Sequence, residues 1–168
     1  MTIAEFDQMP VKEKRELLGN CCGSQAWITK MLGIFPVQNL VDLLEYAEDE
    51  WYDCNPEAWL EAFEKHTGFS DLKTIREKDS DNSEWAFEKE WRILNFSTDM
   101  IGKFLEATKL YEETFGYHFI IAAREKSTNE VLEILLQRLK NNPEEELRIA
   151  AAEQNKITQI KLKNLFGE

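Results

Sequence analysis

The chain has 168 residues, 43% of them hydrophobic, with five Trp and ten Phe. This length and apolar content are typical of one folded domain with its own core and exclude a disordered chain. The formal net charge of −12 argues against non-specific nucleic-acid binding and adsorption to anionic membranes, because both draw their affinity from Lys and Arg. A small anionic substrate remains compatible with an acidic surface, since a local cationic pocket can form on it.

The cysteine pattern and the first residues of the chain indicate the cellular compartment of the protein. The three Cys, at positions 21, 22 and 54, are odd in number, and two of them are adjacent. Such a set does not make a disulfide framework, and reduced thiols are the simpler interpretation. No apolar run reaches the ~20 residues that a membrane-spanning helix needs, and the first residues lack the basic and apolar regions of a signal peptide. We therefore expect a cytoplasmic protein that binds neither membrane nor nucleic acid.

Apolar residues recur at helical spacing along the whole chain, which predicts an all-α fold, a single-domain bundle over residues 1–168. About eight helices are expected, near residues 3–8, 10–20, 24–33, 37–52, 56–65, 84–93, 98–114 and 128–166, the last broken around 141–143. Two apolar stripes carry the pattern most clearly: Val37, Leu40, Val41, Leu44 and Ala47, and later Val131, Leu132, Leu135, Leu136 and Leu139.

Helix start signals agree with these ranges. Proline stands at an expected first helical position three times, at Pro10, Pro56 and Pro143. Capping residues are expected at Ser24, Asn55 and Asn142, with a capping box formed by Ser127 and Glu130.

Two stretches break the helical pattern. Residues 117–123 are apolar and aromatic, which fits either an extended connector or the start of a buried helix. Residues 66–83 combine Gly with Asp, Asn and Ser, which is turn chemistry and a natural place for a site.

Few residues carry recognisable chemistry. The chain has two His, at 66 and 118, and no His or Cys pair at metal-ligand spacing, so a metal site is not expected. Periodicity alone favours His66 as a cation at a helix end over a catalytic role. Cys22 could hold a thiolate at a helix N-terminus, but a buried structural Cys is the stronger interpretation. Lys161 falls on an inward face of the last helix, where it either snorkels to the surface or points into an anion pocket.

Several strings, in order and spacing, resemble the 2-oxo-4-hydroxy-4-carboxy-5-ureidoimidazoline (OHCU) decarboxylases over nearly the whole chain. They are Cys22-Gly23-Ser24 with Trp27; the stretch from Trp59 to Phe63 leading to His66; Tyr111-Glu112 with Phe115-Gly116-Tyr117 and Phe119-Ile120; and a closing helix with Leu147, Ala150, Glu153-Gln154, Lys156-Ile157 and Leu162.

The resemblance implies an all-helical fold, a possible homodimer and a carbon–carbon lyase without a cofactor, which forms allantoin in urate degradation. Loss of the carboxylate and stereospecific protonation need a cation for anionic groups and a His as acid or base. The implied catalytic residues are His66, Lys89 and Glu90. The implied substrate-binding residues are Lys161, Thr67, Ala86, Phe119, Ile120, Ile121 and Ala123, with backbone contacts from the segment 119–124.

The chain departs from the family pattern at this site. Counted without gaps, the family's Glu-Gln pair falls on Lys89 and Glu90, and its substrate-binding Arg falls on Lys161. The first change inverts a charge, and the last loses the bidentate fork that a carboxylate or ureido group prefers. The family's His-Pro string is His66-Thr67 here.

Two hypotheses follow from these departures. In the first, the chain is an active OHCU decarboxylase, with Lys161 in place of Arg and Glu88 or Glu90 in place of the missing carboxylate. In the second, it is a diverged relative that binds or processes another small anionic ureide-like ligand. A third hypothesis, an acidic helical adaptor, has no motif behind it.

Overall fold

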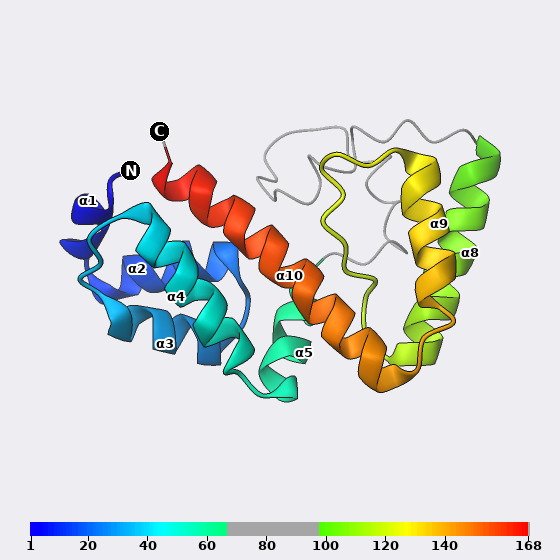
Figure 1. Ribbon diagram of the computed structural model, residues 1–168, viewed down its shortest axis with the longest axis horizontal. Coiled ribbons are helices and arrows are strands. Elements are labelled where there is room, and N and C mark those ends of the chain that lie inside the picture. The colour runs from blue at the N-terminus through cyan, green and yellow to red at the C-terminus, as the bar shows by residue number, and fades with distance from the viewer. Residues whose placement is uncertain (67–97, 168) are drawn as a thin grey trace. The chain divides into compact units, whose positions relative to one another are not determined.

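The computed structural model describes residues 1–66 and 98–167 (Figure 1). Within these two stretches the chain forms eight α-helices and no β-strand, which confirms the all-α prediction. The helices are α1 (Ile3–Asp7), α2 (Val11–Cys21), α3 (Gln25–Ile34), α4 (Leu40–Tyr52), α5 (Pro56–Glu64), α8 (Thr98–Phe115), α9 (Thr128–Arg138) and α10 (Pro143–Phe166). The helix predicted at 84–93 and the turn region at 67–83 lie outside the described residues.

The predicted helix starts are confirmed to within one residue at α3, α5 and α9. The side chains of Ser24 and Asn55 accept hydrogen bonds from the backbone of Trp27 and Ala58, and so cap α3 and α5. The capping box at the start of α9 is present. The break in the last predicted helix is real, because α9 ends at Arg138 and α10 begins at Pro143. Pro10 precedes α2 rather than opening it.

The stripe predicted for α4 is partly right, since Val37 and Ala47 are buried and Leu40 and Leu44 are half-buried. The buried residues of this helix are Leu43, Ala47 and Trp51, whereas Val41 is 64% exposed. The core-facing side is centred on Leu43, Ala47 and Trp51, so Val41, two positions before Leu43, faces away from it. The stripe of α9 is also partly wrong, since Leu136 is 46% exposed.

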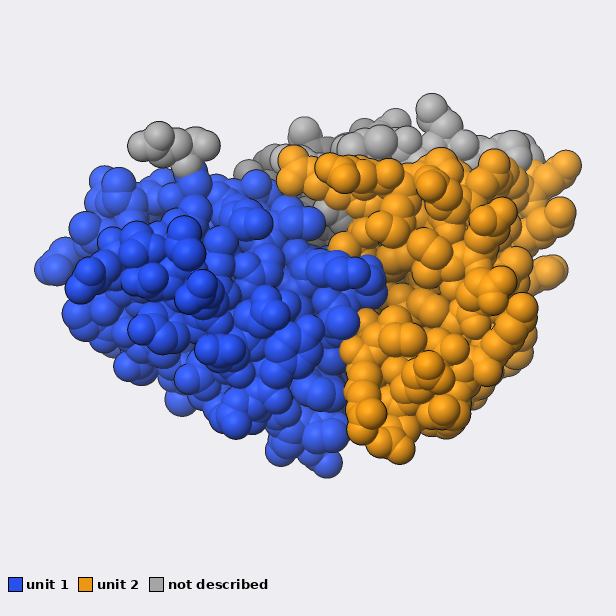
Figure 2. All heavy atoms as spheres, viewed as in Figure 1, with its two compact units in different colours: residues 1–65, 151–168 blue, residues 66–150 orange. Residues whose placement is uncertain are grey.

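The chain divides into two compact units (Figure 2). Residues 1–65 and 151–168 form the first unit, and residues 66–150 form the second. Helix α10 contributes residues 143–150 to the second unit and the remainder to the first. None of the helices that the structure describes is long and apolar enough to cross a bilayer.

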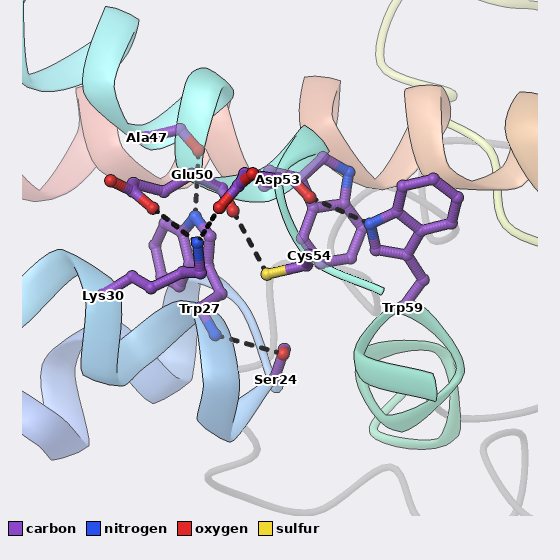
Figure 3. A network of polar contacts seen from close by, with 9 residues as sticks. Ser24, Trp27, Lys30, Ala47, Glu50, Asp53, Cys54 and Trp59 are labelled. Atoms are coloured by element: carbon purple, nitrogen blue, oxygen red, sulfur yellow. Dashed lines mark hydrogen bonds and ion pairs between the residues drawn. The ribbon is translucent and has the colours of Figure 1, made fainter. Parts of the chain in front are cut away.

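Indole groups tie the helices of the first unit together (Figure 3). The Nε1–H of Trp27 donates to the backbone oxygen of Ala47 in α4, at 2.9 Å. Trp59 of α5 donates to the oxygen of Trp51, and Trp51 donates to the oxygen of Ala151 in α10, each at 2.9 Å. Each indole thus packs an apolar ring and satisfies its only donor, so α3, α4, α5 and α10 are held in fixed positions.

In the second unit, the stretch after α8 is the extended connector rather than a helix. Residues 117–123 contain no helical turn. The side chains of Phe119, Ile120, Ile121 and Ala123 are nevertheless buried, each at most 3% exposed. An irregular segment therefore runs through the interior of this unit, beside helices α8, α9 and the start of α10.

Candidate functional site

His66 follows α5 directly, as the sequence predicts. Helix α5 ends at Glu64, Lys65 is its C-cap, and His66 is half-buried. Ala58, Ala62 and Phe63 form the buried face of the helix. His66 thus follows a helix turn that is packed within the first unit.

Two contacts hold that last turn against the start of α3. The backbone at Gly23 comes so close to Lys65 that a Cβ at position 23 would lie 2.3 Å from Lys65 Cγ and 2.7 Å from Lys65 Cβ. The carboxylate of Glu61 accepts a hydrogen bond from the backbone N–H of Gln25, at 2.8 Å. A carboxylate at a helix N-terminus satisfies an unpaired donor and interacts favourably with the helix dipole. The glycine of the Cys-Gly-Ser string thus has a physical role, because any side chain at position 23 would force Lys65 to move.

Lys161 lies on α10 in the first unit and is half-buried. Its Nζ donates to the backbone oxygen of Asn20, at 3.1 Å. Asn20 is in the last turn of α2, where carbonyl groups lack helical partners and the helix dipole favours a positive charge. Lys161 is therefore anchored at a helix C-terminus, and the contact uses one of its three donors.

The cysteines of the first unit are buried thiols. Cys21, Cys22 and Cys54 are all free, as predicted. Burial raises the pKa of Cys21 and that of Cys22 to about 12, although the charge of Lys161 opposes the shift. Both thiols are thus protonated near neutral pH, which is the reverse of what an attacking thiolate needs.

In the second unit, a buried ion pair holds the connector 117–123. The Nη1 of Arg138 donates to the backbone oxygen of Ile120, at 2.6 Å. The Nε and Nη2 of Arg138 lie 2.7 and 2.6 Å from Oε1 of Glu146. The side chain of Arg138 is 6% exposed and that of Glu146 is fully buried. Removal of one partner from a buried pair of this kind is expected to destabilise the folded protein strongly, because the other charge is left buried and unpaired.

Two further groups complete the coordination of the Glu146 carboxylate. The hydroxyl of Tyr111 donates to Oε1 at 2.5 Å, and the amide of Asn141 donates to Oε2 at 2.9 Å. Burial raises the pKa of Tyr111 far above its ordinary value, and the nearby Glu146 adds to this while Arg138 opposes it. Tyr111 therefore stays a hydrogen-bond donor over the whole physiological range.

Sequence reasoning missed this cluster, although one signal was available. Arg138 stands at i+7 from Val131 and i+3 from Leu135, which is a core-facing position of α9. A charged residue at such a position calls for a buried partner. The sequence does not single out this partner, because it lies in a run of three acidic residues, Glu144, Glu145 and Glu146. Only Glu146 is buried.

The predicted site draws on both units and on residues outside the described ranges. Thr67, Ala86, Lys89 and Glu90 lie outside them, as does Glu88. Lys161 belongs to the first unit, and His66 and the segment 119–123 belong to the second. That these groups form one site stays a prediction. In the part of the chain that the structure describes, no group of three or more His, Cys, Asp or Glu side chains is arranged to hold a metal ion.

Comparison with known proteins identifies relatives along nearly the whole chain. Residues 7–163 match the OHCU decarboxylase family. The chain is 32% identical over 153 residues to the uric acid degradation bifunctional protein TTL of Arabidopsis thaliana, covering 88% of this chain. It is also 35% identical over 75 residues to the 2-oxo-4-hydroxy-4-carboxy-5-ureidoimidazoline decarboxylase of Mus musculus. This match covers 45% of this chain and 42% of the mouse protein.

The fold matches a solved structure of similar size. A crystal structure of an OHCU decarboxylase in the presence of (S)-allantoin superposes with a TM-score of 0.73 at 29% identity, covering 89% of this chain and 96% of that one. The bifunctional relatives are longer, since this chain spans 46% of the Arabidopsis protein and 33% of the bifunctional protein PucL of Bacillus subtilis.

Proposed function

Because the chain belongs to the OHCU decarboxylase family, we propose that it converts OHCU to allantoin in urate degradation, without a cofactor. The observation that carries this proposal is the family match over residues 7–163. The fold likeness to an OHCU decarboxylase crystallised with (S)-allantoin supports it.

The reaction sets clear demands on a protein site. The bond between ring carbon 4 and its carboxylate breaks and CO₂ leaves, the freed electron pair forms a double bond between carbons 4 and 5, and the π pair of the carbon 5–nitrogen double bond moves to the ring nitrogen, which takes up a proton. Carbon 5 then takes up a proton, while the 4-hydroxyl group becomes the ring carbonyl. The (S) product requires proton delivery to one face only. A site therefore needs a fixed proton donor and groups that hold the ureide in one orientation.

We assign these roles to the residues that match the family. His66 serves as the acid or base, because an imidazole is the side chain that most often transfers protons in catalysis. Lys161 holds an anionic group of the substrate as a point charge. The backbone of 119–123 contacts the ureide. Lys89 and Glu90 take the places of the family's Glu and Gln.

The experiment that tests this proposal measures loss of freshly generated OHCU together with the appearance of optically active allantoin. Loss of a general acid or base costs about 10²–10⁴-fold in rate, so His66→Asn should lower kcat at least about a hundredfold. His118→Asn is the matched control, because His118 is the only other His of the chain and pairs with Glu112 at 2.8 Å in the second unit. Native activity that survives His66→Asn would contradict the assignment.

The alternative is a diverged relative that binds or processes another small anionic ureide-like ligand. The departures at Lys89, Glu90 and Lys161 favour it. Under this alternative the native chain binds allantoin or related ureides but turns over OHCU slowly. Restoring the family pattern with Lys89→Glu, Glu90→Gln and Lys161→Arg should then raise turnover by about one power of ten or more, each worth about 1.4 kcal/mol of barrier. If the triple change instead lowers the rate of the native protein, the hypothesis of a diverged relative is excluded.

A homodimeric state and a cytoplasmic location are further proposals. The family resemblance supports the first, and the free, buried thiols fit a reducing compartment. Light scattering coupled to gel filtration tests the first, and a fluorescent fusion in the source cell tests the second.

A further inference from the structure

The connector 117–123 has an unusual burial pattern for irregular chain. Phe119, Ile120 and Ile121 are successive residues, and each is at most 1% exposed. Successive side chains of non-helical backbone point in different directions, so this segment is covered on more than one side. Its backbone groups are therefore away from water and need partners, either within the protein or on a bound ligand.

Arg138 supplies such a partner in a geometry that only arginine can provide. Its guanidinium donates to the oxygen of Ile120 through Nη1 and contacts Glu146 through Nε and Nη2. Its Cζ also lies 4.6 Å from the centroid of the Phe119 ring. Because the guanidinium is planar and rigid, the carbonyl, the carboxylate and the ring are fixed relative to one another.

The anchor of Arg138 is itself held by three elements. Glu146 lies in α10 and accepts from Tyr111 of α8 and from Asn141, which follows α9. The position of one backbone carbonyl in the connector is thus tied, through one carboxylate, to every described helix of the second unit. A group locked by such supporting contacts is what a precise binding site requires.

We propose that Arg138 is a positioning residue, which holds the backbone of 119–123 in the arrangement that binds the ureide part of the substrate; this inference rests on the proposed function. A ureide carries both N–H donors and carbonyl acceptors, and the backbone of an ordered connector offers the complementary groups. Arg138 acts through Ile120 and does not touch the substrate. Its loss therefore weakens binding of ground state and transition state alike, which raises KM and leaves kcat nearly unchanged.

The test replaces the whole ion pair, because a single replacement would leave a buried charge alone and destabilise the fold. The variant is Arg138→Met with Glu146→Gln, in which the introduced amide oxygen accepts from Asn141 and the amide NH2 donates to the hydroxyl of Tyr111, which can also accept. The matched control is Arg148→Met with Glu144→Gln, the same charge change in an exposed pair of α10. We expect the first variant to raise KM for OHCU about tenfold, with kcat within about twofold, because uniform binding of ground state and transition state is lost. The control should match the native protein.

Hydrogen exchange provides a second measurement that does not depend on turnover. In the first variant, amide exchange should accelerate in 119–123 and not in the helices of the first unit. A lower kcat with unchanged KM would overturn the inference, because it would report only a smaller folded fraction. Unchanged exchange in 119–123 would also overturn it. If the native chain neither turns over OHCU nor binds allantoin, the proposed function fails and the ureide role of Arg138 fails with it. An active native chain with an unaltered KM in the variant refutes the positioning role alone.

Discussion

The last turn of α5, which leads to His66, and the connector 117–123, which carries predicted site residues, are held in place by different interactions. The turn that precedes His66 is held by a close backbone approach at Gly23 and by the carboxylate of Glu61 at the start of α3. The connector is held by a buried ion pair between Arg138 and Glu146. Close packing therefore holds the last turn of α5, whereas a buried ion pair holds the connector.

This difference determines what each region tolerates. Close packing is sensitive to added volume, because neighbouring atoms must move to admit even one methyl group. A buried ion pair is insensitive to small shape changes but very sensitive to removal of one charge. The four predictions below use substitutions that separate the two cases, from the largest expected effect to the smallest.

Removal of one charge from the second unit should have the largest effect. Glu146→Ala leaves the guanidinium of Arg138 buried without its carboxylate and deprives Tyr111 and Asn141 of their acceptor. We expect a loss of about 3–5 kcal/mol in the free energy of unfolding, measured by urea denaturation.

The control for this prediction is Glu144→Ala, which removes a carboxylate from an exposed pair with Arg148 on the same helix. Exposed pairs contribute about 0–1 kcal/mol, so this variant should remain close to the native stability. Equal losses in the two variants would mean that burial of the Arg138 pair has no energetic consequence.

Added volume should have the next largest effect, and it should act on the first unit. Gly23→Ala places a methyl group within 2.7 Å of two side-chain carbons of Lys65. Because these carbons are close to the backbone, the last turn of α5 has to shift. We expect a loss of about 1–3 kcal/mol in stability and, through displacement of His66, about a tenfold fall in kcat.

Gly33→Ala is the matched control, since no atom lies within 4 Å of a Cβ built at position 33. This residue lies in α3, where Ala is favoured over Gly by up to about 1 kcal/mol. The control should therefore be as stable as the native protein or more so, with unchanged kcat. A kcat for Gly23→Ala equal to that of the control would show that the close approach does not position His66.

The same distinction explains what could be predicted from sequence. Helix ranges and caps depend on neighbours three or four residues away, so signals such as Asn55 before Pro56 were sufficient to find α5. The position of His66 followed from the end of that helix. The contact of Gly23 with Lys65 and the pairing of Arg138 with Glu146 depend on how helices pack, and no local pattern encodes them. The stripe of α4 was right at Ala47 and wrong at Val41, because the buried side of this helix is set by its packing and is centred on Leu43, Ala47 and Trp51.

Alkaline pH should weaken the first unit through its thiols. Burial raises the pKa of Cys22 from an ordinary value of 9.0 to about 12. Below pH 9 the thiol is protonated in the folded and unfolded chain alike, so stability is unaffected. Above pH 9 the unfolded chain loses the proton first, and stability falls by up to about 1.4 kcal/mol per pH unit until the folded pKa is reached.

The measurement compares urea midpoints at pH 8 and pH 10 for the native protein and Cys22→Ala. The native protein should lose about 1–2 kcal/mol more than the variant over this interval. Tyr111, whose pKa is also raised by burial, contributes equally to both proteins and cancels in the difference. The same loss in both would show that Cys22 is not desolvated.

The smallest effect should come from the far end of α5, and it separates stability from positioning. The side chain of Asn55 accepts a hydrogen bond from the backbone N–H of Ala58, at 3.0 Å. Asn55→Ala removes this cap and should cost about 1 kcal/mol, measured by urea denaturation. Because the cap lies at the opposite end of the helix from His66, the last turn and its contact with Gly23 remain in place. We therefore expect unchanged kcat and KM for Asn55→Ala, whereas Gly23→Ala loses activity at a comparable cost in stability. If Asn55→Ala lowers kcat as much as Gly23→Ala does, activity follows the stability of α5 as a whole, and steric placement of its last turn has no separate role.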